Sequence, residues 1–197
     1  MLHYRANNAP VRKGDLLLCD AGAEYGFYAS DITRTWPTNG RFSKAQRELY
    51  DIVLLAQTEC IRNAVVGAAY DVIHQTAVEV MTDGLLSLGL LKGSLKKNIE
   101  SAAYKKFYMH KTGHWIGLDV HDVGEYKLGG ASRLLEPGMV FTVEPGLYIA
   151  PGTAGVPEKY QGIGIRIEDD VLMTAKGLEV ISDGVPKTVD AIEALMA

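Results

Sequence analysis

The sequence has few cysteines, no long apolar run and no block of basic residues, and each absence excludes a class of protein. Cys19 and Cys60 are the only cysteines among 197 residues, too few for a disulfide-stapled fold, and neither lies in a C-x-x-C pair. We therefore expect both to be small core residues in a reducing cytoplasm. No apolar run approaches the ~18 residues that span a bilayer, and the first ten residues lack the apolar stretch of a secretion signal.

The charge and composition are those of an ordinary globular protein. Twenty basic and 24 acidic residues give a net charge of -4, and no cluster of lysine and arginine provides a surface for nucleic acid. Apolar residues make up 47% of the chain and charged residues 22%. We expect one domain over residues 1–197, with neither nucleic acid nor membrane as a partner.

The order of predicted elements is strands, then helices, then strands. Residues 15–36 are predicted to form a hairpin. Three helices are expected, over residues 43–66, 71–88 and 94–106; the first begins with a capping box formed by Ser43 and Gln46. From residue 107 onward, short apolar runs separated by glycine and proline predict strands. This order predicts an α+β domain, with helices packed on a mainly antiparallel sheet.

Two aspartates lie on the predicted hairpin. If the hairpin closes at Tyr25 and Gly26, Asp20 faces Asp31 on the opposite strand. Facing Cβ atoms are about 4.5–5.5 Å apart, so two like charges there are destabilising unless a cation lies between them. The alternative is that Asp20 is a turn residue and Asp31 is exposed.

Two glutamates occupy strand positions in the second half. In GIGIRIEDD, isoleucines alternate with Gly164, Arg166 and Glu168, so the arginine and the glutamate share one face of a strand. Glu144 ends the apolar run MVFTVEP. Each has a simpler interpretation: an ion pair on a solvated face for Arg166 and Glu168, and an ordinary turn residue for Glu144.

Three of the five histidines, His110, His114 and His121, fall within twelve positions. Gly113 and Gly117 lie between them and argue against a helix, so this is not an H-E-x-x-H motif. Together with the four carboxylates, the cluster indicates a mainly oxygen-donating ligand set. Such a set is too acidic for a typical structural zinc site and suits Mn²⁺, Co²⁺ or Zn²⁺ in a two-metal centre.

Four segments carry a resemblance to a known family. They are DAGAEYGFYASDITRTWP, MHKTGHWIGLDVHDVG, LEPGMVFTVEPGLYIAP and VPEKYQGIGIRIEDDVL. They resemble the blocks of the pita-bread (creatinase/aminopeptidase-like) metallopeptidases, and within that group they look most like aminopeptidase P, the Xaa-Pro aminopeptidase. The resemblance runs over essentially the whole chain and implies a pita-bread fold with a curved sheet.

The resemblance also implies a set of metal ligands. Asp31 and Glu168 would bridge two divalent ions, Mn²⁺ being the first expectation. Asp20 would complete the shell of one ion, and His114 with Glu144 that of the other. A water bridging the ions would lose a proton and attack a peptide bond that precedes proline.

Further roles come from the same resemblance. Glu144 would carry a proton to the leaving proline nitrogen, and His121 would stabilise the developing oxyanion. His110 and His3 would line the pocket on the proline side. Arg166 would fix the geometry of the carboxylates. Tyr148 and Trp115 are expected to be packing residues, and Asp119, Asp122 and Asp169 to support the site or lie on the surface.

Members of the family usually carry a separate N-terminal domain and further residues before the first ligand strand. The resemblance implies that both lie outside this sequence, as in a fragment, a minimised protein or half of a split enzyme. The helices predicted over residues 43–66 and 71–88 would then expose apolar surface, which favours homo-oligomers.

Two other functions are compatible with these residues. A prolidase, which hydrolyses Xaa-Pro dipeptides, would use the same metal centre. A catalytically impaired pita-bread module that binds peptide or protein would be expected to lack ligands, whereas all five ligand positions are filled here. A methionine aminopeptidase is disfavoured, because the DVHDVG and VPEKYQGIGIRIEDD segments do not suit it.

Overall fold

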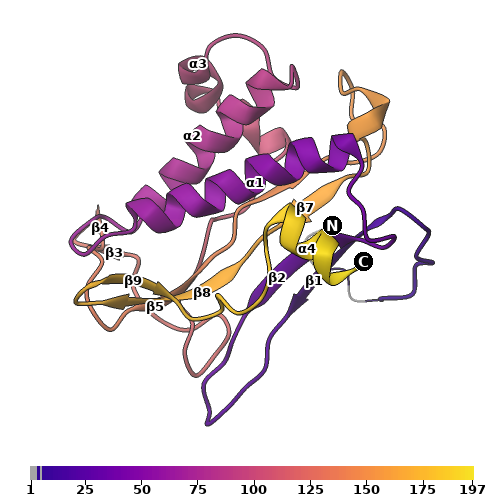
Figure 1. Cartoon of the computed structure of the whole chain (residues 1–197). Coiled ribbons are helices and arrows are strands. Elements are labelled where there is room, and N and C mark those ends of the chain that lie inside the picture. The colour runs from indigo at the N-terminus through magenta and orange to yellow at the C-terminus, as the bar shows by residue number, and fades with distance from the viewer. Residues whose placement is uncertain (1–3, 5) are drawn as a thin grey trace.

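The computed structural model describes residue 4 and residues 6–197 as helices and antiparallel strands (Figure 1). The first strands are β1 (Leu16–Ala21) and β2 (Ile32–Pro37). The helices that follow are α1 (Lys44–Asn63), α2 (Val72–Ser87), α3 (Leu95–Glu100) and the 3₁₀ helix η1 (Ala103–Lys106). The later elements are β3 (Lys127–Leu128), β4 (Ala131–Ser132), β5 (Val140–Val143), β6 (Gly146–Tyr148), η2 (Glu158–Tyr160), β7 (Gly164–Arg166), β8 (Asp169–Thr174), β9 (Gly177–Val180) and α4 (Val189–Leu195). The predicted α+β composition is confirmed.

The strands of the second half run as one long antiparallel pair with a short interruption. β5 pairs with β8, where Val143 faces Asp169, and β6 pairs with β7, where Gly146 faces Arg166. The register is the same on both sides of the break, so Glu144 lies opposite Glu168. Pro145 falls at the break because it has no N–H group to donate.

The hairpin of β1 and β2 has a register that differs from the prediction. Asp20 pairs with Thr33, not with Asp31, and the turn closes between Tyr25 and Tyr28. The expectation that Asp20 and Asp31 face each other is therefore wrong, because the turn lies one residue later in the chain than predicted. A shift of the turn by one residue keeps the alternation of side chains, so both aspartates remain on one face and become diagonal neighbours.

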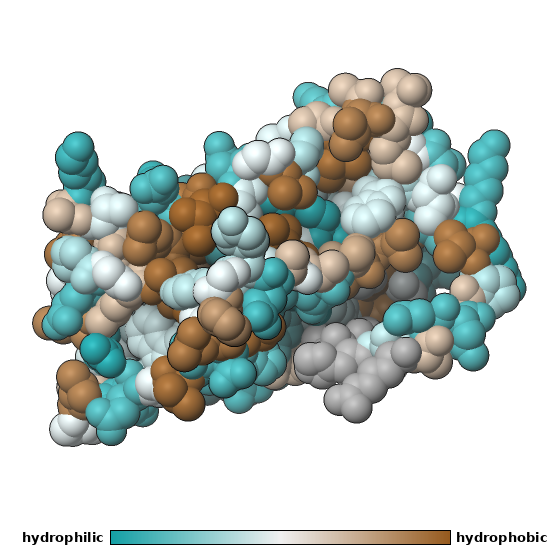
Figure 2. All heavy atoms as spheres, turned by 90° about the horizontal axis from the view of Figure 1, so that it is seen from below, coloured by the Kyte–Doolittle hydropathy of each residue, from teal (hydrophilic) through white to brown (hydrophobic). Residues whose placement is uncertain are grey.

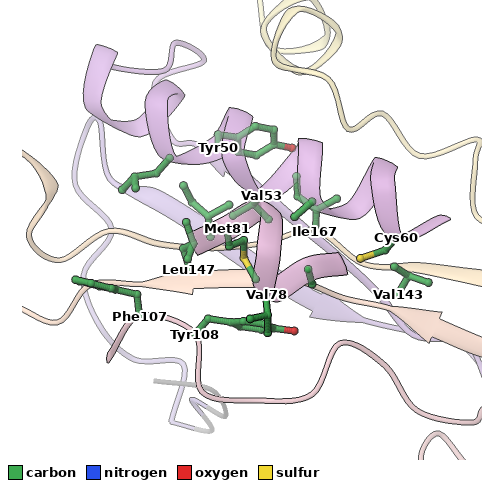
Figure 3. Packing of buried hydrophobic residues seen from close by; sticks show 14 of the residues in the cluster. Tyr50, Val53, Cys60, Val78, Met81, Phe107, Tyr108, Val143, Leu147 and Ile167 are labelled. Carbon is green, nitrogen blue, oxygen red and sulfur yellow. The ribbon is translucent and has the colours of Figure 1, made fainter. Parts of the chain in front are cut away.

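The hydrophobic core lies between the helices and the strands. α1 and α2 pack against each other on one side of the strands (Figure 1). In Figure 3, Tyr50 and Val53 of α1 and Met81 of α2 meet Leu147 and Ile167 from the strand pair. All five side chains are almost completely buried. This packing holds the strand pair, and with it Glu144 and Glu168, against a rigid helical layer.

Two of the predicted helices end earlier than expected. α1 begins at the predicted capping box of Ser43 and Gln46 but ends at Asn63, because Gly67 and Ala68 form backbone hydrogen bonds with Leu135. This pairing draws the chain away from the helix.

The predicted helix over residues 94–106 is also divided. Ala102, at φ 53°, separates α3 from η1. The Ser101 hydroxyl donates to the Lys97 carbonyl, a local side-chain bond that competes with helix continuation.

Surface exposure departs from two further expectations. Cys60 is buried, as predicted, but Cys19 is exposed on β1 and is not a core residue. Of the two segments expected to expose apolar surface, residues 43–66 have three exposed large apolar side chains, Leu55, Val65 and Val66, and residues 71–88 have none. Hydrophobic and hydrophilic residues are intermingled on the face in Figure 2. Within the described residues, no helix is both long enough and apolar enough to cross a bilayer.

Candidate metal centre

Residues from four separate segments converge on one cavity of about 740 Å³. The β1–β2 hairpin supplies Asp20 and Asp31, and the segment before β3 supplies His114. Each strand of the long pair supplies one glutamate at its break: Glu144 follows β5, and Glu168 precedes β8. Ligand atoms of His114, Glu144 and Glu168 lie within 4.8 Å of one another, and so do those of Asp20, Asp31 and Glu168. The structure therefore brings together all five predicted ligands.

The hairpin is held against the strand pair by direct hydrogen bonds. Glu168 N donates to Thr33 O at 3.0 Å, and the Thr35 hydroxyl donates to Arg166 O at 2.9 Å. Glu168 is 1% exposed and also accepts a hydrogen bond from the Thr33 hydroxyl. The alternative of a solvated ion pair for Arg166 and Glu168 is therefore excluded, because both faces of this strand are buried.

His114 reaches the cluster because its segment pairs with β5. Thr142 N donates to His114 O at 2.9 Å, and Glu144 N donates to Thr112 O at 2.8 Å. Gly113 permits this approach, since a Cβ atom there would lie only 2.0 Å from Thr142 O. The pairing sets the histidine beside Glu144.

The orientation of the His114 ring suits a metal ligand. Nδ1 lies 2.9 Å from Trp115 O, to which it can donate, so the lone pair of Nε2 is free to face the cluster. Nε2 lies 3.4 Å from Asp31 Oδ2 and 3.8 Å from Glu144 Oε1.

The pKa values of three of the four carboxylates, Asp20, Glu144 and Glu168, are raised by burial and by neighbouring carboxylates, whereas hydrogen bonds with His114 and Asp20 outweigh burial and lower the pKa of Asp31. Burial raises the pKa of Glu144 to about 7; Asp31 and Asp20 add to the rise, whereas His114 and Arg166 oppose it. Burial, followed by Glu144 and Asp31, raises the pKa of Glu168 well above its usual value. A divalent cation would favour the ionised forms and remove this repulsion, so the residues present fit a metal centre.

Arg166 is the buried cation of the site. It is 4% exposed and donates to a carboxylate oxygen of Asp20, to the Thr33 hydroxyl at 3.1 Å and to the Tyr148 hydroxyl at 3.1 Å. These contacts fix the carboxylate of Asp20 and, through Thr33, that of Glu168. The position supports the predicted role of Arg166 in holding the geometry of the ligands.

The two remaining described histidines of the predicted set also border the cavity. His121 is exposed at the rim, and its ring centroid lies 4.3 Å from that of His114. His110 Nε2 lies 3.0 Å from the Tyr148 hydroxyl, and Nδ1 lies 3.8 Å from Glu144 Oε2. His3 lies outside the described residues.

The sequence did not reveal several residues of the site. Tyr148 is buried, as expected, but its hydroxyl links His110 to Arg166 and is more than a packing group. Thr33 connects Arg166 to Glu168. The only available signal was the alternation of Thr33 with Asp31 along β2. Asp119 is exposed and Asp122 half-buried, in line with the predicted peripheral role.

Asp169 has a structural environment distinct from that of the ligands. It is completely buried and accepts from Arg34 Nη2 at 2.7 Å, Ser182 Oγ at 2.6 Å and Lys187 Nζ at 2.6 Å. Burial raises its pKa, but Arg34 and Lys187 outweigh burial and lower the value to about 2. Asp169 therefore stabilises the position of β8, the strand that follows Glu168.

Comparison with known proteins identifies relatives of one kind, metallopeptidases. A family model described as metallopeptidase family M24 matches residues 1–175. The chain is 51% identical to an Xaa-Pro aminopeptidase of Haemophilus influenzae, over all of this chain and 45% of that protein. It is 53% identical to an Xaa-Pro aminopeptidase of Escherichia coli, over all of this chain and 44% of that protein. The chain thus spans less than half the length of these relatives.

Solved structures agree with this assignment. The structure of Pseudomonas aeruginosa aminopeptidase PepP matches with a TM-score of 0.98 and 55% identity, over 99% of this chain and 44% of that chain. A zinc-substituted E. coli aminopeptidase P in complex with product matches with a TM-score of 0.95. The predicted pita-bread fold is confirmed by these matches, and the chain belongs to metallopeptidase family M24.

Proposed function

We propose that this chain provides the catalytic site of an aminopeptidase that removes an N-terminal residue preceding proline. The observation that carries the proposal is the convergence of two aspartates, one histidine and two glutamates in a single cavity. Relatives that are 51% and 53% identical carry the name Xaa-Pro aminopeptidase. The proposed substrates are therefore peptides with proline at the second position.

The ligand set is proposed to hold two divalent ions, with Mn²⁺ as the first expectation and Co²⁺ or Zn²⁺ as alternatives. Asp31 and Glu168 would lie between the ions, Asp20 would complete one shell, and His114 with Glu144 the other. Among the described residues, three triads of possible ligands occur, and Glu168 belongs to the two that consist of the five proposed ligands alone, which supports a bridging position. When bound, such ions lower the pKa of a coordinated water and polarise the scissile carbonyl.

The chain's own residues would handle protons and charge. Glu144 is half-buried beside the cluster and can hold a proton on its carboxylate and pass it to the leaving proline nitrogen. His121, next to His114 at the rim, would donate to the carbonyl oxygen as negative charge develops there. His110, fixed by Tyr148, would line the proline side, together with His3. A cytoplasmic location and self-association remain predictions.

The proposed function is tested with two peptides. The protein is loaded with Mn²⁺ and incubated with Ala-Pro-Ala and, separately, with Ala-Pro. Release of alanine from the tripeptide is the expected result, because the metal pair and Glu144 act on the bond before proline. Cleavage of the dipeptide alone would assign the chain to prolidases. Stoichiometric metal without cleavage of either peptide would contradict the proposal and favour the impaired peptide-binding module.

A further inference from the structure

The cavity continues beyond the metal cluster along the start of α2. His74, in the first turn of this helix, forms part of the wall together with Lys111 and Thr112. These last two residues lie between His110 and His114, so this wall adjoins the side of the cluster to which the proline ring is assigned. The proposed reaction gives His74 no role.

Two buried hydroxyls lie against His74. Tyr108 is 1% exposed and Thr112 is 2% exposed. The Tyr108 hydroxyl is in hydrogen-bond contact with the Thr112 hydroxyl, and Thr112 Oγ1 lies 2.8 Å from His74 Nδ1. Tyr108 also lies 3.4 Å from the same ring nitrogen. A buried O–H group needs an acceptor, so both hydroxyl protons must be placed within this group of three.

The placement of these protons fixes the tautomer of His74. The Tyr108 proton goes to Thr112 Oγ1, because no closer acceptor is available to Tyr108 among the described residues. The Thr112 proton then goes to His74 Nδ1. A neutral imidazole that accepts at Nδ1 carries its proton on Nε2. His74 therefore presents an N–H donor on the side opposite Thr112.

That donor is open to the cavity. Nε2 makes no hydrogen bond with any described residue. It is not one of the fully enclosed atoms, so solvent in the cavity reaches it. Burial, together with Lys111 and Lys105, lowers the pKa of His74 to about 4, so the ring is neutral at physiological pH. Lys111 adds a positive charge to the same wall.

We propose that His74 is a substrate-binding residue whose Nε2–H donates to an oxygen of the peptide segment that follows the proline. The acceptor is a main-chain carbonyl or the terminal carboxylate, and the neighbouring Lys111 favours the carboxylate of a short peptide. The inference rests on the proposed function, because that function assigns the direction in which the peptide leaves the metal cluster. Thr112 and Tyr108 act as positioning residues that set the tautomer.

The tautomer is tested first by nuclear magnetic resonance. Two-bond ¹⁵N–¹H correlations of the His74 ring in the metal-loaded protein are expected to show a proton on Nε2. The T112V variant, which lacks the hydroxyl donor, is expected to lose this preference. A wild-type ring that carries its proton on Nδ1 would overturn the inference, since Nε2 would then have no proton to donate.

Binding of the leaving group is measured separately by isothermal titration calorimetry. The probes are Pro-Ala-Ala and free proline, each added to metal-loaded wild type and to H74L. One net hydrogen bond is worth about 0.5–1.5 kcal/mol, so H74L is expected to bind Pro-Ala-Ala about two- to tenfold more weakly. Proline binding is expected to be unchanged. H74Q, which keeps an N–H donor, should recover part of the loss.

The controls separate this inference from the proposed function. E79L, an exposed position on α2, should leave both affinities unchanged. Equal affinities of H74L and wild type for Pro-Ala-Ala overturn the inference, whether or not Ala-Pro-Ala is cleaved. If H74L selectively loses Pro-Ala-Ala binding while wild type does not cleave Ala-Pro-Ala, the His74 site is supported and the peptidase assignment is contradicted.

Discussion

The Glu144→Gln variant is expected to cleave Ala-Pro-Ala about 10²–10⁴-fold more slowly than wild type, which is the range for loss of a positioned proton carrier. Glutamine has nearly the same shape and keeps an oxygen that can face His114, but its amide cannot accept and return a proton. Glu144 is the carboxylate best placed for this task, because it is half-buried and lines the cavity beside both His114 and His110.

The measurement is kcat at saturating peptide, with metal content determined on the same samples. E136Q makes the same chemical change at an exposed position eight residues earlier and should be unaffected. A Glu144→Gln enzyme that keeps more than about a tenth of wild-type kcat at equal metal content would show that another group moves the proton.

The Arg34→Met variant is expected to lower the free energy of unfolding by about 3–5 kcal/mol, the usual cost of removing one partner of a buried ion pair. Arg34 is 6% exposed and bonds Asp169 at 2.7 Å. It also donates to Glu168 O at 2.6 Å and Val185 O at 2.9 Å. The variant leaves Asp169 buried with less compensating charge and removes a donor from four carbonyl groups, because Thr33 O and Pro186 O also accept from Arg34.

Urea unfolding at a fixed metal concentration measures this loss. R41M is the matched control, since Arg41 is largely exposed and its pair with Glu193 is worth at most about 1 kcal/mol. Similar stabilities of the two variants would contradict this expectation and show that Lys187 and Ser182 compensate Asp169 without Arg34.

Features that depend on neighbouring residues were predictable from the sequence. The capping box of Ser43 and Gln46 forms as expected, because both partners lie within one helical turn. The alternation of Arg166 and Glu168 likewise placed both on one face. The sequence could not show whether that face meets solvent, since the β1–β2 hairpin that covers it lies more than 130 residues away along the chain.

The hairpin register was missed for a physical reason. The turn places Gly26 at φ 59° and Phe27 at φ 67°. Positive φ is uncommon for a bulky residue, so the sequence favoured a turn centred one residue earlier, on Tyr25 and Gly26. A shift of the turn by one residue moves each pairing by two positions, so Asp20 and Asp31 still lie on the same face of the hairpin. The predicted ligand set is therefore unaffected by the wrong register.

Contacts between distant segments were beyond the reach of local patterns. The link from Tyr148 to Arg166, and the group formed by His74, Thr112 and Tyr108, depend on how α2 and β6 pack against residues 107–114. Tyr148 and Tyr108 look like core residues in the sequence and are buried, yet their hydroxyls orient polar groups of the cavity. Only the three-dimensional arrangement distinguishes these two roles.

The number of divalent ions bound per chain is the most direct test of the central claim that five residues form a dinuclear metal centre. We would measure it by elemental mass spectrometry after loading with Mn²⁺ and removal of free metal, for wild type, Asp20→Ala and Glu168→Ala. The expected result is two ions in wild type, one in Asp20→Ala, and none in Glu168→Ala, which removes a ligand shared by both ions. Binding of no ion or a single ion by wild type, or full occupancy in Glu168→Ala, would contradict the account.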